Sequence, residues 1–469
     1  MQLRRAFLRL AIFVCLAVPN FAQAETLAGA LARAYAGNPN VGQQRAALRA
    51  LTEGASKARA GWRPTIGATA YAGRSYLYQR DPSVRNQMPT PGVDPAEDEA
   101  LKPPRGQKFN SFPRGYGLSV SQPIFDGFKT LNSVRQAEAQ IFGGREDVRA
   151  VEQDTLLATA TAYMDVLRDT AIVGLRAGNV AVLKVQASHT RERILMGQAT
   201  GVDAAQADAA LAQGRSDHSA ARGALQASKA TYRRLVGVEP NSLAPAKSVE
   251  VLLPNDVELA VEIALREHPV IASAVHVADA AGSGVKLAES ALYPTAGIVG
   301  SVNRDLDVDG TTGKKSFSAA IFGQLNVPIY GGGADYASVR QAKERFGQAR
   351  LAADIQRDQV RATVVTTWAQ LQAAKAQIVS TRAAVKAAES ALVDMRGEAE
   401  AGQRTTFDVL TAQQTLLNAR VAHVAAQRDR VVFSYAVLAA TGRLTASVLN
   451  IPERLSPRDA ITRGGRYGF

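Results

Sequence analysis

The sequence predicts an α+β fold in which one module of strands and long helices is used twice. Residues 197–212 read GQATGVDAAQADAALA and residues 402–417 read GQRTTFDVLTAQQTLL, so Gly, Gln, Thr and Asp recur at the same offsets. The Pro-Ile-aromatic motif at 123–125 recurs at 328–330. After Pro123 and Pro328 come two long proline-free stretches, 124–239 and 329–451, which contain the repeated turns and favour extended helical structure.

These repeats predict an order of elements that is the same in both halves of the chain. In each module, alternating apolar and polar residues indicate two strands, and a long helical hairpin follows them. The first copy carries extra residues in a loop near 79–111 that is rich in Pro, Asp, Asn and Gly, and the matching loop at 304–316 is shorter. The expected bounds are a first module at 25–250 (strands about 64–78 and 114–123, helical hairpin about 131–236), a second module at 255–451 (strands about 294–303 and 316–327, helical hairpin about 336–441) and a C-terminal tail at 452–469.

The first 24 residues are expected to be a signal peptide. A basic start, MQLRR, precedes the apolar run AFLRLAIFVCLAV and the small-residue site Ala22-Gln23-Ala24. We therefore expect export and cleavage before Glu25. The only cysteine, Cys15, lies inside this leader and lacks the context of a lipoprotein signal, so no acyl anchor is expected.

Composition and motifs argue against nucleic-acid binding and against enzymatic activity. The formal net charge is +13, but Lys and Arg are scattered among Asp and Glu without a compact basic patch. The five histidines show no metal-ligand spacing, and neither a nucleophile elbow nor a phosphate-binding loop is found. The sequence predicts no catalytic residues, no cofactor and no metal site.

The repeated turn motif predicts how each long hairpin reverses direction. Gly197 and Gly402 suit the left-handed conformation that ends a helix. Thr200 with Asp203, and Thr405 with Asp408, have the spacing of a capping box that starts the next helix. A simple helix cap therefore remains one interpretation of both aspartates.

The strands predict an oligomer in a membrane. Beyond the leader no run of 18 apolar residues suggests a transmembrane helix. Four strands per chain cannot close a barrel, whereas three chains would supply 12. A Pro and an aromatic residue mark every strand–helix junction. An aromatic girdle at the membrane interface requires such residues, and aromatic packing at a bend in the chain is the alternative interpretation. These pairs are Trp62 with Pro64, Pro123 with Phe125, Tyr293 with Pro294, and Pro328 with Tyr330.

The chain resembles the TolC family of outer-membrane channels over nearly all of 25–451. The resemblance rests on the duplicated module, the strand starts GWRPTIGA and ALYPTAGI, the Pro-Ile-(Phe/Tyr) strand ends and the paired Gly-Gln-x-Thr-x-x-Asp turns. It implies a homotrimer with a 12-stranded barrel in the lipid of the bacterial outer membrane and a coiled-coil helical tunnel in the periplasm. A periplasmic adaptor and an inner-membrane pump of the ABC or RND type would dock on the helical tips.

The resemblance also implies roles for the turn residues. Asp408 matches an acidic ring at the periplasmic constriction, and Arg404 matches a basic residue that reaches an acid on the neighbouring chain, for which Asp203 is the counterpart. Thr411 stands where the closest family pattern has a second acid, and Ala399 stands where it has a Tyr, so both departures would weaken the gate. The turn residues expected to meet the adaptor are Gly197, Gln198, Thr200, Gly402, Gln403 and Thr405.

The most favoured function is the exit duct of a tripartite export system, with type I protein secretion ahead of multidrug or metal efflux. Lipid-anchored efflux outlets carry a cysteine directly after the leader, where this chain has Glu25. A periplasmic adaptor is the weaker rival, because it would contain one helical hairpin instead of two. The transported substrate is not encoded in any motif of the sequence.

Overall fold

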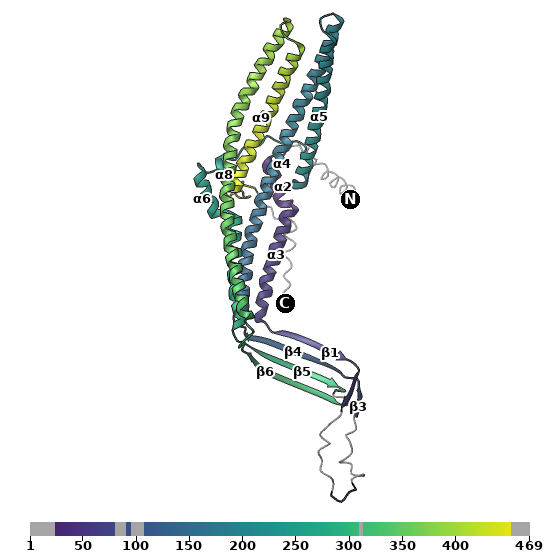
Figure 1. The fold of residues 1–469 in the computed structure, drawn as a ribbon, viewed down its shortest axis with the longest axis vertical. Helices are drawn as coiled ribbons and strands as arrows, with labels where there is room; N and C mark the ends of the chain where they lie inside the picture. The colour runs from purple at the N-terminus through teal and green to yellow at the C-terminus, as the bar shows by residue number, and fades with distance from the viewer. Residues whose placement is uncertain (1–23, 80–90, 95–106, 309–312, 452–469) are drawn as a thin grey trace, which may run out of the picture. The chain divides into compact units, whose positions relative to one another are not determined.

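The computed structural model describes residues 24–79, 91–94, 107–308 and 313–451 (Figure 1). The expected leader and C-terminal tail, and much of the expected 79–111 loop, lie outside these ranges. Two compact units are present. One joins Met1–Ala50, Ile141–His276 and Arg350–Phe469, and the other joins Leu51–Gln140 and Val277–Ala349. Both units draw on both sequence modules.

Helices form most of the described chain. Two of them, α4 and α8, contain 67 residues each and would each be about 100 Å long at 1.5 Å per residue. None of the helices in the described ranges is long and apolar enough to cross a membrane. The helices are α2 (Leu27–Gly37), α3 (Pro39–Arg59), α4 (Lys129–Leu195), α5 (Gly201–Val236), α6 (Val257–Glu267), α7 (Pro269–Glu289), α8 (Ala334–Glu400) and α9 (Thr406–Ala440).

Two equivalent breaks interrupt the helices that precede each first strand. Asn38 separates α2 from α3, and His268 separates α6 from α7. Both residues are extended, with ψ values of 126° and 124°, because a following proline disfavours the helical conformation. The proline then starts the next helix, where its missing N–H is not needed.

The helical unit has its largest apolar core where α4 passes between α2, α5 and α9. Leu156 and Tyr163 of α4 are fully buried there, together with Tyr232 of α5 and Leu438 of α9. The Tyr163 hydroxyl lies 2.7 Å from the carbonyl oxygen of Glu25 and 2.6 Å from that of Ala244. This core therefore ties the start of the described chain to the segment that links the two sequence modules.

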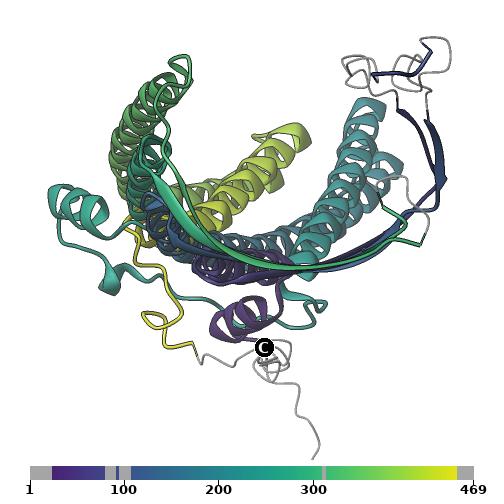
Figure 2. The same cartoon turned by 90° about the horizontal axis from the view of Figure 1, so that it is seen from below.

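The second unit contains a four-stranded antiparallel sheet, in the order β1-β4-β5-β6, which Figure 2 shows to be strongly curved. Its strands are β1 (Thr65–Ala72), β4 (Arg114–Phe125), β5 (Thr295–Leu306) and β6 (Lys315–Asn326). A separate hairpin of β2 (Ser75–Gln79) and β3 (Gln107–Ser111) extends from β1 and β4. The sequence pattern predicts one strand over 64–78 and places 107–111 in a loop. The structure divides the strand at Gly73 and pairs its second part with β3.

The two faces of the four-stranded sheet differ in polarity. Residues directly opposite one another across antiparallel strands share a face, so the register assigns each side chain. One face is apolar and carries Ile66, Ala68, Leu118, Val120, Val302, Ala319 and Ile321. The other is mainly polar and carries Thr69, Ser119, Ser301, Asn303 and Ser318. This alternation is typical of strands that separate lipid from an aqueous interior.

Candidate functional site: the two helical turns

The turns that close the two helical hairpins have the same hydrogen-bonding pattern. After α4, the N–H of Gly197 donates to Ile194 O at 2.9 Å and that of Gln198 donates to Arg193 O at 2.8 Å. After α8, Gly402 and Gln403 donate to the equivalent carbonyl oxygens at 3.2 and 2.8 Å. The glycines have φ values of 73° and 78°. Both helices thus end in a Schellman motif, which needs a left-handed residue at the glycine position.

Both return helices begin with a complete capping box. The Thr200 hydroxyl accepts from the N–H of Asp203 at 3.3 Å, and Asp203 Oδ2 accepts from the N–H of Thr200 at 2.9 Å. The corresponding distances for Thr405 and Asp408 are 3.2 and 3.0 Å. The capping role that the sequence left open for the two aspartates is therefore present at both turns.

The same contacts set the charge of these aspartates. The backbone hydrogen bond from Thr405, followed by that from its hydroxyl, holds the pKa of Asp408 below its usual range. The equivalent bonds from Thr200 lower the pKa of Asp203. Because hydrogen bonds to a carboxylate favour its ionised form, both aspartates are negatively charged at neutral pH.

Arg404 forms an ion pair that the sequence analysis did not anticipate. Its Nε atom lies 2.8 Å from Glu398 Oε2 of the same chain, and both side chains are about half exposed. This pairing raises the pKa of the Arg404 side chain above its ordinary value. Glu398 lies near the end of α8, and its carbonyl oxygen accepts a hydrogen bond from the N–H of Gln403 across the turn.

Thr411 and Ala399 occupy helical positions beside the second turn. The exposed Thr411 hydroxyl donates to Phe407 O at 2.9 Å, so its one donor hydrogen is used within α9. Ala399 packs against a small apolar cluster that contains Leu392 and Val409. Neither residue supplies charge at the turn.

The strand–helix junctions place their aromatic residues in two ways. Phe128 contacts Phe125 at a ring-centroid distance of 5.2 Å and Tyr293 at 6.1 Å, in edge-to-face arrangements. Phe128 and Tyr293 are nevertheless about half exposed, like Trp62, and Tyr330 is the most exposed of these side chains. Pro64, Pro123, Pro294 and Pro328 lie at or beside the ends of the four strands. No sequence pattern singles out Phe128, and its φ of 65° shows that the chain turns sharply there.

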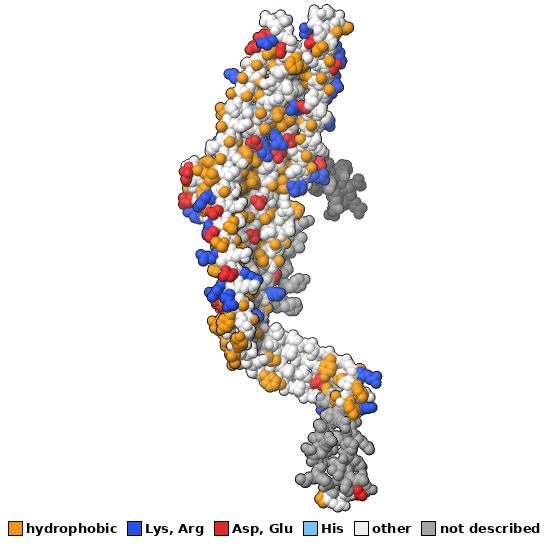
Figure 3. Space-filling model, viewed as in Figure 1, with side chains coloured by type: hydrophobic (Ala, Val, Ile, Leu, Met, Phe, Trp, Pro, Cys, Tyr) orange, Lys and Arg blue, Asp and Glu red, His pale blue; other side chains and the backbone are white. Residues whose placement is uncertain are grey.

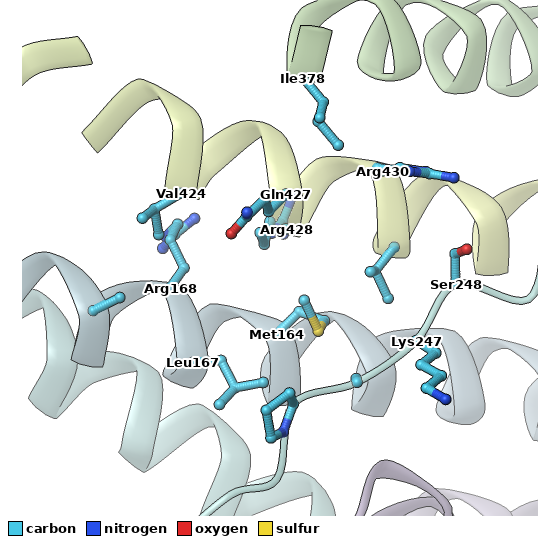
Figure 4. Close-up of a pocket in the computed structure, with 14 residues that line it drawn as sticks. Met164, Leu167, Arg168, Lys247, Ser248, Ile378, Val424, Gln427, Arg428 and Arg430 are labelled. Carbon is cyan, nitrogen blue, oxygen red and sulfur yellow. The ribbon is translucent and has the colours of Figure 1, made fainter. Parts of the chain in front are cut away.

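A cavity of about 720 Å³ lies in the helical unit, between α4, α9 and the segment that links the two sequence modules (Figure 4). Met164 and Leu167 contribute apolar side chains from α4. On α9, Arg428 pairs with Asp165 at 2.9 Å and Arg430 pairs with Glu250 at 2.7 Å. Both cations that α9 contributes to the wall of the cavity are therefore paired with carboxylates of the same chain. Among the described residues, no group of three potential metal ligands is found.

Glu250 is expected to make this region sensitive to acid. Arg430, and then Lys375 at 3.2 Å, lower the pKa of Glu250 from 4.5 to about 2. A lowered folded-state pKa stabilises the protein above pH 4.5, and that contribution is lost as the pH falls through about 2. Glu250→Gln should lower the free energy of unfolding by about 1–3 kcal/mol at pH 7. Denaturant titrations should show the wild-type and variant values converging as the pH approaches 2, and an equal gap at both pH values would contradict the assignment.

Comparisons with known proteins agree with this geometry. The family model described as "Outer membrane efflux protein" matches residues 30–238 and 260–443. The chain belongs to the outer membrane efflux protein family. Outer membrane efflux protein BepC of Brucella suis is 37% identical over 430 residues, which cover 92% of this chain and 88% of BepC. Alkaline protease secretion protein AprF of Pseudomonas aeruginosa is 26% identical over 64% of each chain.

Solved structures show the same fold. The outer membrane protein VceC from Vibrio cholerae superposes with a TM-score of 0.69 at 20% identity, over 89% of this chain and 96% of VceC. The CmeC outer membrane channel of Campylobacter jejuni gives 0.73 at 16% identity, over 94% and 89% of the two chains. This outer membrane efflux protein is therefore a channel and not an enzyme. It is a homotrimer in which four strands per chain form a 12-stranded barrel, and the long helices extend into the periplasm.

Proposed function

We propose that this outer-membrane channel is the exit duct of a type I secretion system, which carries a protein substrate from an inner-membrane pump to the exterior. Channels of this family work with a periplasmic adaptor and an inner-membrane pump. The observation that favours a protein substrate is the similarity to AprF, which is named as an alkaline protease secretion protein.

The second candidate is the efflux of small molecules. Its support is the higher identity to BepC, whose name describes an efflux protein. The two candidates share the channel and differ in the pump that supplies it. The exit duct itself offers no substrate-specific chemistry that would separate them.

The two turns are proposed to form the periplasmic gate and the surface that meets the adaptor. Asp408 from three chains would place three carboxylates around the axis of the trimer, which favours cations in a narrow pore. Arg404 would reach Asp203 of a neighbouring chain. Its pairing with Glu398 within the chain supplies an alternative partner when that link breaks. Exposed ion pairs of this kind contribute at most about 1 kcal/mol, which suits links that must break during opening.

Deletion of the gene in its own bacterium tests the proposed cargo. If the channel serves type I secretion, one or a few proteins should disappear from the culture supernatant of the deletion strain and remain inside the cell. The inhibitory concentrations of common drugs should stay within about twofold of those for the parent strain, because only the exported protein depends on this duct. Plasmid-borne wild type should restore the supernatant protein. An unchanged supernatant together with drug sensitivity would reject protein secretion and favour small-molecule efflux.

A further inference from the structure

The apolar face of the sheet is interrupted by cations near one end. Arg304 lies directly between Tyr116 of β4 and Phe317 of β6 in the strand register. One row farther along the same face, Lys315 of β6 lies opposite Leu306. Arg304, Lys315 and both aromatic residues are exposed. Figure 3 draws the other, mainly polar face of the sheet and shows further Lys and Arg side chains at its end next to β2 and β3.

No described residue of the chain balances the charges of Arg304 and Lys315. Their neighbour Arg114 pairs with Asp307 at 3.2 Å. In contrast, neither Arg304 nor Lys315 has a carboxylate partner among the described residues. Two unpaired cations beside exposed aromatic rings on an otherwise apolar face call for an anion from outside the protein.

The register also gives the depth of these cations in the membrane. The helices leave the sheet at Pro294, on the periplasmic side, and β5 runs from Thr295 towards the opposite end. Arg304 is ten positions after Pro294, so the path is about 34 Å along the strand at 3.4 Å per residue. A tilt of about 40° reduces this to about 26 Å, close to the height of about 25 Å of the apolar band of a barrel. Arg304 thus reaches the outer border of the hydrocarbon layer.

We propose that Arg304 and Lys315 bind the phosphate group of a phosphorylated glycolipid in the outer leaflet of the outer membrane. A guanidinium matches two phosphate oxygens at once, and a lysine ammonium supplies a second point charge. Tyr116 and Phe317 flank Arg304 at the level where aromatic side chains meet lipid head groups. The trimer would carry three such sites around its barrel. This inference rests on the outer-membrane location and not on the choice between protein and drug export.

Lipid titration of the purified trimer tests the site. Diphosphorylated lipid A in detergent is titrated into the wild type and into the double variant Arg304→Gln/Lys315→Gln. The control is a second double variant, Arg382→Gln/Lys386→Gln, which removes two exposed cations from α8. Loss of the charged hydrogen bonds should weaken binding to the first variant about tenfold, and binding to the control should match wild type. Arg304→Lys should retain most of the affinity.

Two results would overturn the proposal. Equal affinity of the double variant and the control for lipid A would remove these cations from lipid binding. Inorganic phosphate that binds wild type as tightly as lipid A would make this a site for a free anion. Lipid A without phosphates should bind both variants and wild type equally weakly. The trimer content and conductance of each variant are measured in parallel, so that a misfolded variant or a failed channel is recognised separately.

Discussion

Gly442→Ala is expected to destabilise the helical unit by about 3 kcal/mol. Gly442 follows α9 with a φ of 76°, and a Cβ atom there would lie 2.8 Å from His268 Cα and 3.1 Å from Glu267 O. Both obstacles are backbone atoms, so neither can move aside cheaply. The substitution would also disturb Arg443, whose Nε and Nη2 atoms lie 2.8 and 2.9 Å from the Glu267 carboxylate.

Trp368 provides a local probe for this change. It packs against an apolar cluster that contains Ala440, and Trp62→Phe removes the only other tryptophan. Gly174→Ala is the matched control, because apart from the adjacent backbone of α4 no atom lies within 4 Å of its added Cβ. The control should be neutral or more stable by up to about 1 kcal/mol. Denaturation curves that coincide for the two alanine variants would refute the proposed packing at Gly442.

Substitutions in the second turn should give the largest functional effects. Asp408→Asn is expected to abolish most of the cation selectivity of the trimer, because it removes three negative charges while an amide oxygen can still cap α9. Arg404→Ala is expected to raise the single-channel conductance several-fold, since a weak link that holds the closed mouth is lost. Both are measured from current–voltage curves in asymmetric KCl.

A second capping aspartate serves as a control that distinguishes an effect of charge at the channel mouth from an effect of lost helix capping. Asp256 caps α6 by accepting from the N–H of Leu259 at 2.6 Å, and it belongs to neither turn. Asp256→Asn should leave selectivity and conductance unchanged. If it alters selectivity as much as Asp408→Asn does, the proposed position of Asp408 in the pore is wrong. Unchanged conductance in Arg404→Ala would reduce that residue to a partner of Glu398.

Much of the fold was predictable because its signals are local and duplicated. Gly197 and Gly402, with the threonine and aspartate that follow each, encode a helix end and a helix start within a few residues. The prolines after Asn38 and His268 mark equivalent helix breaks in the same way. The fold class, the outer-membrane location and the family follow from these repeats and are confirmed by the comparisons.

Other features depend on contacts that sequence patterns do not encode. The pairing of β2 with β3 joins two short segments across a long insertion, and the composition of the insertion suggested a loop. The Glu398 partner of Arg404 lies across the turn, where helix periodicity no longer applies. Phe128 joins Phe125 to Tyr293 only after the chain reverses, and Arg304 is seen to lie between two aromatic residues only in the sheet register.

Single-channel recording of the wild-type trimer in a planar bilayer tests the central claim most directly. The account predicts discrete current steps of small conductance with a preference for cations, because three carboxylates would line a narrow periplasmic mouth. Folded, trimeric protein that inserts into the bilayer and gives no steps would contradict an open path through the molecule. It would also remove the basis for assigning the two turns to a gate.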